Sequence, residues 1–210
     1  MLGRALTAAA RVRARLGSTA PPREALIARH VGGRSFLDVG CMWNVHGALC
    51  FAAEDAGAGA VTGVDVMGAT ERFTAELARR GSRVRFVQGD VHEPATIAAV
   101  GRHDVVWCSG VLYHAPHPLL TLERLRELTA DTLLLATETI VETPGRRGTC
   151  VVAPTRAEHP HAEPAQRPGA GYGPWYWGIS PSALRTMLRL TGFAVVEEHR
   201  TPLHVTIVAR

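Results

Sequence analysis

Three short apolar runs in the first half of the chain each lead into an aspartate. The aspartates are Asp38, Asp65 and Asp90, in runs that begin at Ser35, Ala60 and Val84. A short apolar run bounded by turn residues is typical of a buried strand. If the three strands are parallel, their carboxyl ends lie at one edge of the sheet, where such folds bind ligands. The sequence therefore predicts a nucleoside pocket surrounded by carboxylates.

Strand and helix patterns alternate along most of the chain. Strands are expected at 35–39, 60–66, 84–88, 104–108, 132–136, 193–199 and 203–209. Helices are expected at 45–56, 71–80, 95–100, 118–128 and 180–191. This alternation indicates an α/β fold with a doubly wound, mostly parallel sheet covered on both faces. The last two strands are expected to form a hairpin at the sheet edge, which makes a seven-stranded sheet with an antiparallel last strand.

One domain is expected for the 210 residues, with two segments outside the regular alternation. Residues 1–31 predict a helical cap, broken at Pro21-Pro22, and its early arginines leave a transit peptide or a nucleic-acid arm as alternatives. Residues 143–178 are rich in proline and glycine with little periodicity, which predicts a lid over the site. Oligomeric state is left open.

Composition excludes several classes of protein. The apolar fraction is 46%, the net charge is +4, and no apolar run approaches the roughly 20 residues that span a bilayer. The four cysteines have no metal-type spacing, so buried thiols in a reducing cytoplasm are expected. His159 and His161 share a loop with two glutamates, but the flanking prolines favour a solvated loop, and no metal is predicted.

The turn after the first strand argues against a dinucleotide. Residues 40–47 lack the three spaced glycines of the pyrophosphate fingerprint, and Asp38 would repel a phosphate. The segment Asp38-Val39-Gly40-Cys41 instead resembles the first motif of class I methyltransferases, which use S-adenosylmethionine (SAM). The resemblance is clear over residues 35–138 and implies the Rossmann-like methyltransferase fold with SAM as cofactor. SAM has a zwitterionic methionine end and no phosphate, so a nearby carboxylate is favourable.

The resemblance also implies roles for individual residues. Asp38 and Gly40 would contact the methionine end, Asp65 would accept the ribose hydroxyls, and Asp90 and Val91 would bind adenine. The full set of residues implied to bind the cofactor is Asp38, Gly40, Cys41, Met42, Asp65, Val66, Met67, Asp90, Val91, Ser109 and Tyr113. Members of this class usually have glycines where this chain has Met42 and Asn44. That departure leaves a non-catalytic scaffold as one alternative.

Two later segments, 108–118 and 174–184, resemble small-molecule methyltransferases and the enzymes that alkylate wobble uridine in tRNA. The resemblance places Tyr113 near the cofactor, and Tyr113 and His114 are the expected catalytic residues at the reaction centre. His114 is the expected general base, because histidine suits proton transfer near neutral pH, and His117 is the second candidate. The residues expected at the substrate are His117, Trp175, Tyr176 and Trp177, since aromatic faces hold flat or cationic groups.

The resulting hypothesis is a SAM-dependent methyltransferase with a small-molecule acceptor, oxygen first and nitrogen second. A tRNA-modifying methyltransferase or carboxymethyltransferase is the alternative enzyme. Those tRNA enzymes carry an additional amino-terminal region, whereas only about 30 residues precede the first strand here. Nucleic acid is therefore not expected as a partner.

Overall fold

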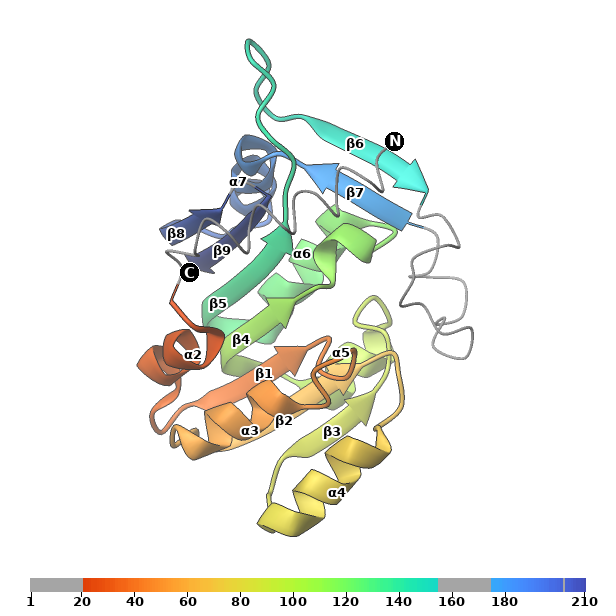
Figure 1. The fold of residues 1–210 in the computed structure, drawn as a ribbon, viewed down its shortest axis with the longest axis vertical. Helices are drawn as coiled ribbons and strands as arrows, with labels where there is room; N and C mark the ends of the chain where they lie inside the picture. The colour runs from red at the N-terminus through yellow and green to blue at the C-terminus, as the bar shows by residue number, and fades with distance from the viewer. Residues whose placement is uncertain (1–20, 155–174, 202) are drawn as a thin grey trace.

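A computed structural model describes residues 21–154, 175–201 and 203–210. Its main sheet contains β1 (Ser35–Val39), β2 (Ala60–Asp65), β3 (Arg85–Gln88), β4 (His103–Ser109), β5 (Thr129–Glu138), β8 (Val195–Thr201) and β9 (His204–Ala209). Across the sheet the order is β3-β2-β1-β4-β5-β9-β8 (Figure 1). Strands β1 to β5 pair in parallel and β9 is antiparallel to both neighbours, as predicted.

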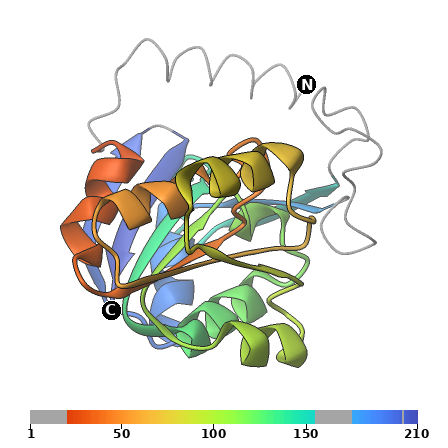
Figure 2. The same ribbon diagram turned by 90° about the horizontal axis from the view of Figure 1, so that it is seen from below.

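Helices cover both faces of this sheet (Figure 2). They are α2 (Arg23–Val31), α3 (Ala48–Asp55), α4 (Glu71–Arg80), α5 (Pro94–Val100), α6 (Pro118–Leu128) and α7 (Pro181–Leu190). Side chains of α2, α3 and α4 form one buried cluster, and those of α5, α6 and α7 form the other. Alternating residues of β1 supply both clusters: Phe36 faces the first, and Leu37 and Val39 face the second. Asp38 therefore lies on the Phe36 side, toward α3.

Local sequence signals explain the best-predicted helices. α4 begins after Thr70, whose hydroxyl accepts a hydrogen bond from the Phe73 N–H, and ends at Gly81 in the left-handed conformation. α7 begins after Ser180, whose hydroxyl accepts from the Ala183 N–H, with Pro181 at the first position. The predicted bounds of 71–80 and 118–128 match α4 and α6. By contrast, α3 begins three residues later than expected, because residues 42–47 form turns.

The segment 143–178 differs from the expected irregular lid. β6 (Cys150–Pro154) and β7 (Trp175–Ile179) pair antiparallel as a separate two-stranded sheet. Both strands are too short for a clear period-2 signal in the sequence. β7 contacts a 3-10 turn, η1 (Leu112–His114), so this small sheet lies beside the carboxyl end of β4. The part of the predicted lid at 155–174, with His159 and His161, lies outside the described residues, as does most of the predicted cap at 1–31.

The structure bears on two expectations from composition: the burial of the cysteines and the membrane-spanning character of the helices. Cys41, Cys50 and Cys108 are buried free thiols as predicted, whereas Cys150 on β6 is exposed, which corrects the expectation for that residue. In the described ranges, no helix combines the length and the apolar character needed to cross a membrane.

Candidate active site

The turn after β1 is held by backbone contacts and by left-handed residues. Gly40 has φ +84°, and its N–H donates to the Val64 carbonyl at 2.9 Å. Asn44 and His46 also have positive φ, at 55° and 48°, which non-glycine residues rarely adopt. The Met42 side chain is fully buried in the cluster beneath α3. Its bulk therefore packs into the core, while the exposed Asn44 takes a conformation for which glycine is usually used.

We expect Gly40→Ala to lower both stability and cofactor affinity. A Cβ at this position would lie 2.5 Å from Val111 Cγ2, on a backbone with positive φ. The combined clash and strain should cost about 1–3 kcal/mol in the free energy of unfolding, measured by chemical denaturation. Gly57→Ala is the matched control, because Gly57 has φ +83° but nothing within 4 Å of its added Cβ. Equal losses in the two variants would contradict a tight contact at Gly40.

Asp65, at the end of β2, holds this turn. One carboxylate oxygen accepts from the Met42 N–H at 2.7 Å, and the other accepts from the Met67 N–H at 2.8 Å. Burial raises the pKa of this carboxyl despite those stabilising hydrogen bonds. Asp65 is therefore already engaged with the backbone. Each carboxylate oxygen can accept a second hydrogen bond, so acceptor capacity for ribose hydroxyls is present.

Asp38 is almost completely buried between β1 and α3. Its carboxylate accepts a hydrogen bond from the Cys50 thiol, with sulfur and oxygen 3.6 Å apart. Burial raises the pKa of Asp38 to about 7, and the charge of Asp65 raises it further. The nearby charge of Arg23, at the start of α2, acts in the opposite direction. The structure thus brings Asp38 and Asp65 close enough to interact, with Arg23 in the same neighbourhood.

Asp90 follows β3, the strand next to β2. Its carboxylate accepts from the His92 N–H at 2.8 Å, which is a local turn contact. Val91 is buried in the cluster on the α5 side, and Val66 and Met67 are half-buried after β2. Cys41 is fully buried, so only its backbone is positioned to contact a ligand. The predicted cofactor residues Asp38, Asp65 and Asp90 therefore lie at or near the ends of β1, β2 and β3, and the charges of Asp38 and Asp65 interact.

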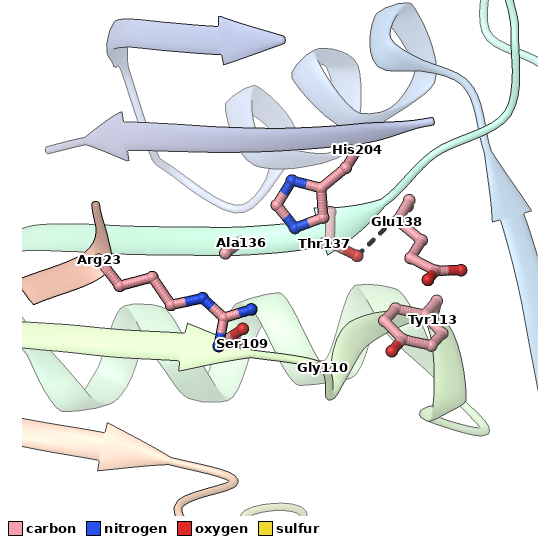
Figure 3. Close-up of a pocket in the computed structure, with 8 residues that line it drawn as sticks. All are labelled: Arg23, Ser109, Gly110, Tyr113, Ala136, Thr137, Glu138 and His204. Atoms are coloured by element: carbon pink, nitrogen blue, oxygen red, sulfur yellow. Dashed lines mark hydrogen bonds between the residues drawn. The ribbon is translucent and has the colours of Figure 1, made fainter. Parts of the chain in front are cut away.

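A small cavity lies at the neighbouring ends of β4 and β5. Its volume is about 210 Å³, and its lining comprises Arg23, Ser109, Gly110, Tyr113, Ala136, Thr137, Glu138 and His204. In Figure 3 the Arg23 guanidinium lies beside Ser109 at one end, Glu138 lies over Tyr113 at the other, and His204 lies between them. The predicted residues Ser109 and Tyr113 thus share a polar cavity with the cation that acts on Asp38.

His114, the expected general base, and His117, the second candidate, both lie outside the lining of this cavity. The His114 ring packs against Tyr113, with ring centroids 4.2 Å apart, and His114 is not among the residues that line the cavity. His117 is exposed at the start of α6, where its carbonyl accepts from Thr121. Trp177 packs against the core, and its indole nitrogen is buried without a hydrogen-bond partner among the described residues. The side chains of Trp175 and Tyr176 lie outside the described part of the chain.

Four polar residues of the cavity were not predicted from the sequence: Arg23, Thr137, Glu138 and His204. Glu138 and His204 are register partners at the junction of β5 and β9, so their side chains share one face. The expected β5 ended two residues too early, at 136, which hid Glu138. A signal was present, since His204 is the second residue of the last predicted strand, and it lies directly opposite that extension. Arg23 comes from α2, which begins 80 residues before β4 in the sequence.

Comparison with known proteins defines the class of this chain. Residues 4–198 match the family described as "Methyltransferase domain". The chain therefore belongs to the methyltransferase domain family, and the expected class, a class I SAM-dependent methyltransferase, is confirmed. No curated protein matches the chain.

Solved structures share the fold at low sequence identity. The N-terminal domain of EvdMO1 with bound SAH has a TM-score of 0.65 and 22% identity, covering 89% of this chain and 78% of that one. A Burkholderia thailandensis 1,6-didemethyltoxoflavin-N1-methyltransferase with bound substrate and S-adenosylhomocysteine has a TM-score of 0.64 and 22% identity, covering 99% and 85%. The [4+2]-cyclase SpnF has a TM-score of 0.61 and 18% identity, covering 89% and 78%. At these identities the similarity establishes the fold, and the chemistry has to be argued from the site.

Proposed function

We propose that this chain methylates a small polar acceptor, with a hydroxyl oxygen as the first choice of acceptor atom and nitrogen as the second. The observation that carries the proposal is the cavity of about 210 Å³ at the ends of β4 and β5, with Tyr113, Glu138 and His204 in its wall. Its polar lining suits an acceptor that forms hydrogen bonds, and its size suits a small molecule. The toxoflavin methyltransferase and EvdMO1 structures, which hold small ligands in the same fold, support this proposal.

The donor site fits SAM through complementary charge. Asp38 and Arg23 offer an anion and a cation in one neighbourhood, which matches the ammonium and carboxylate of an amino acid. Asp65 retains acceptor capacity for ribose hydroxyls, and Asp90 with Val91 would bind adenine. Val66 and Met67 would flank the base. When bound, SAM would supply an electrophilic methyl group, whose bond to sulfur breaks as an aligned nucleophile bonds to the methyl carbon, with S-adenosylhomocysteine as the leaving group.

The chain's own contribution is alignment and proton removal. Good alignment of two reactants can supply roughly 7–11 kcal/mol of the barrier reduction. Tyr113 and Glu138 would hold the acceptor by hydrogen bonds, and His204 would take its proton as the nucleophile forms a bond to the methyl carbon. His114, packed against Tyr113, would position that ring. Because His204 lines the cavity, we place it ahead of His114 as the base.

We expect His204→Gln to lower kcat by about 100-fold without changing the affinity for SAM, since a general base typically contributes 10²–10⁴-fold. His114→Gln, the matched variant outside the cavity, should lose less than about tenfold. Initial rates against pH separate the roles, because only His204→Gln should lose the acidic limb of the profile. A larger loss in His114→Gln, accompanied by loss of that limb, would return the base to His114.

Acceptor class can be tested with labelled SAM. The full chain is incubated with [methyl-³H]SAM and either the small-molecule fraction of a cell extract or total tRNA. Label in the small-molecule fraction is expected, and mass spectrometry of the product then distinguishes O-methyl from N-methyl. Label in tRNA would overturn the proposal in favour of the RNA-modifying alternative. No label in either fraction, together with no binding of SAM, would favour a non-catalytic scaffold.

A further inference from the structure

A second cavity lies away from the proposed donor and acceptor sites, between the loop after β5, the start of α7 and strand β8. It is an open groove of about 970 Å³. Four arginines line it: Arg146 and Arg147 from the loop, Arg185 from α7 and Arg200 from β8. None of its lining residues lines the cavity at Tyr113. Three segments distant in sequence thus converge to present guanidinium groups in one place.

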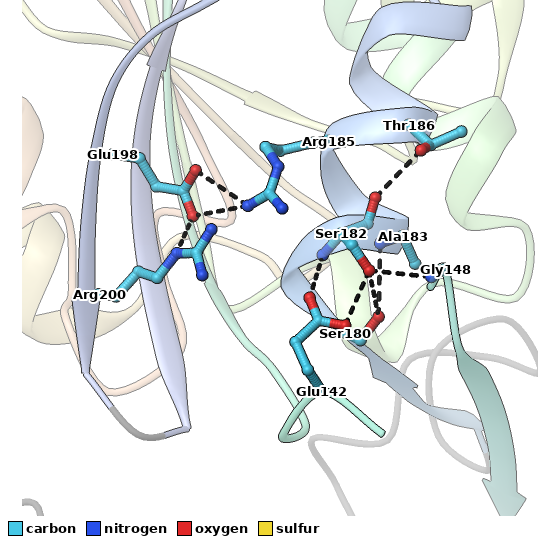
Figure 4. Close-up of polar contacts among 9 residues, drawn as sticks. All are labelled: Glu142, Gly148, Ser180, Ser182, Ala183, Arg185, Thr186, Glu198 and Arg200. Carbon is cyan, nitrogen blue, oxygen red and sulfur yellow. Dashed lines mark hydrogen bonds and ion pairs between the residues drawn. The ribbon is translucent and has the colours of Figure 1, made fainter. Parts of the chain in front are cut away.

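Two of these arginines are held in place by one carboxylate (Figure 4). Arg185 Nη1 lies 3.3 Å from both oxygens of Glu198, and Arg200 donates its Nε–H to the same carboxylate. Glu198 is mostly buried, with 17% of its side chain exposed, whereas Arg185 and Arg200 are 39% and 46% exposed. A planar guanidinium has five donors, so both arginines keep donors for a ligand. The Glu198 carboxylate therefore orients both guanidinium groups before any ligand binds.

The loop that carries the other two arginines is anchored on α7. Glu142 accepts from the Ser182 N–H at 2.6 Å and from the Ser182 hydroxyl at 2.8 Å. The Gly148 N–H donates to the Ser182 hydroxyl, and the Thr149 N–H donates to the Ser180 hydroxyl. These contacts fix the loop on both sides of the Arg146-Arg147 pair. The Glu142 carboxylate therefore has a structural role, because its hydrogen bonds to Ser182 attach the loop to α7.

The groove has an excess of positive charge. Four guanidinium groups face the carboxylates of Glu142 and Glu198, which leaves two positive charges over. Elsewhere in the described ranges, five arginines lie in ion pairs with acidic neighbours: Arg29, Arg34, Arg79, Arg80 and Arg124. The groove therefore brings two guanidinium charges in excess of its carboxylates into one pocket of small-molecule size.

We propose that this groove binds a phosphate-bearing small molecule. Arginine matches phosphate oxygens through paired N–H donors, and several arginines together favour a doubly charged phosphoryl group over a single carboxylate. Arg200 pairs in register with Val205, the residue that follows His204 on β9. Because consecutive side chains of a strand point to opposite faces, the groove and the acceptor cavity lie on opposite faces of the sheet, near the same end of β9. The phosphate has two possible sources: the acceptor itself, or a separate effector molecule.

Isothermal titration of the full chain with sodium pyrophosphate at low ionic strength tests the proposal. Saturable binding is expected for the wild type. Arg185→Gln/Arg200→Gln should weaken it by at least about tenfold, because two charge-assisted contacts are lost. Arg189→Gln is the matched control, since Arg189 lies on the same helix outside the groove. It should change the dissociation constant by less than about twofold.

A second double variant is needed because the first one can misfold: removing Arg185 and Arg200 leaves the Glu198 carboxylate without its partners. Arg146 and Arg147 are exposed, and neither side chain is hydrogen-bonded to another described residue. Arg146→Gln/Arg147→Gln should therefore keep the wild-type melting temperature and still weaken pyrophosphate binding several-fold. Absence of saturable binding by the wild type, or unchanged binding by both double variants, would overturn the proposal.

The source of the phosphate can be determined with the labelling assay, and this part alone rests on the proposed function. Treating the small-molecule fraction with phosphatase before adding [methyl-³H]SAM should abolish labelling if the acceptor carries the phosphate. Labelling that survives the treatment assigns the groove to a separate effector. The pyrophosphate titration stands independently, so failure of methyl transfer and failure of phosphate binding are distinguishable.

Discussion

Replacing Asp38 by asparagine should stabilise the ligand-free chain at pH 8 and remove most of its affinity for SAM. Burial raises the pKa of Asp38 to about 7, so keeping the carboxylate ionised above that pH costs free energy in the folded state. A neutral amide of similar shape avoids the cost. The gain should be about 2–4 kcal/mol at pH 8, since each pKa unit corresponds to about 1.4 kcal/mol. The same change removes the anion proposed to meet the ammonium of SAM.

The sign of the pH dependence follows from proton linkage. The folded pKa of Asp38 lies above its usual value of 3.8, so the folded chain binds more protons than the unfolded chain between pH 4 and 7. The contribution of Asp38 to stability is therefore fully present below the unfolded pKa, and it is lost as the pH rises through about 7. Asp38→Asn should accordingly differ from the wild type at pH 8 and approach it at pH 5.

Melting temperatures of the wild type and of Asp38→Asn at pH 5 and pH 8 provide the measurement. A gain of roughly 4–16 °C is expected at pH 8, given about 2–4 °C per kcal/mol for a chain of this size. Asp104→Asn is the opposite control, because hydrogen bonds from the Ser35 N–H and hydroxyl lower the pKa of Asp104. It should destabilise at pH 8. An Asp38→Asn variant that is less stable than the wild type at pH 8 would show that the carboxylate is needed structurally.

Asp65→Ala should cause the largest loss of stability of any single change at the site. The substitution leaves the Met42 and Met67 N–H groups without their acceptor, and each buried unpaired donor costs about 1–3 kcal/mol. A total loss of about 2–5 kcal/mol in the free energy of unfolding is expected. Because the turn that follows β1 loses its hydrogen bond to Asp65 of β2, the affinity for SAM should also fall in this variant.

Urea denaturation checks this prediction, with Asp55→Ala as the matched surface control. Asp55 pairs with Arg80, and its side chain is 65% exposed, so its removal should change the free energy of unfolding by no more than about 0.5 kcal/mol. A similarly small change in Asp65→Ala would mean that water readily replaces the carboxylate and that the turn does not depend on Asp65.

Much of the fold was predictable because its signals are local. Apolar runs that end in aspartate located β1 and β2, and cap residues located α4 and α7. Strand alternation with helices then implied the parallel sheet and the edge at which the site lies. The sequence pattern did not predict the short strands β6 and β7. Their pairing depends on contacts between residues that are separated by at least 20 others in the sequence.

The site was predictable only in part, because its geometry depends on long-range contacts. The sequence placed Asp65 at the end of β2, but nothing local indicated that its oxygens bind the backbone of Met42 and Met67. Arg23 comes from α2, which begins 80 residues before β4, and His204 comes from β9, which begins 95 residues after the end of β4. Only the three-dimensional arrangement brings them together. The arginine groove has the same origin, since its four arginines come from three separate segments.

A crystal structure of the chain grown with S-adenosylhomocysteine tests the central claim most directly. The account predicts an adenosine across the carboxyl ends of β1, β2 and β3, with its ribose hydroxyls on Asp65, its adenine beside Asp90, and its amino-acid end between Asp38 and Arg23. Millimolar ligand that leaves this edge empty, or that binds with its adenosine elsewhere, would contradict the assignment of the three aspartates.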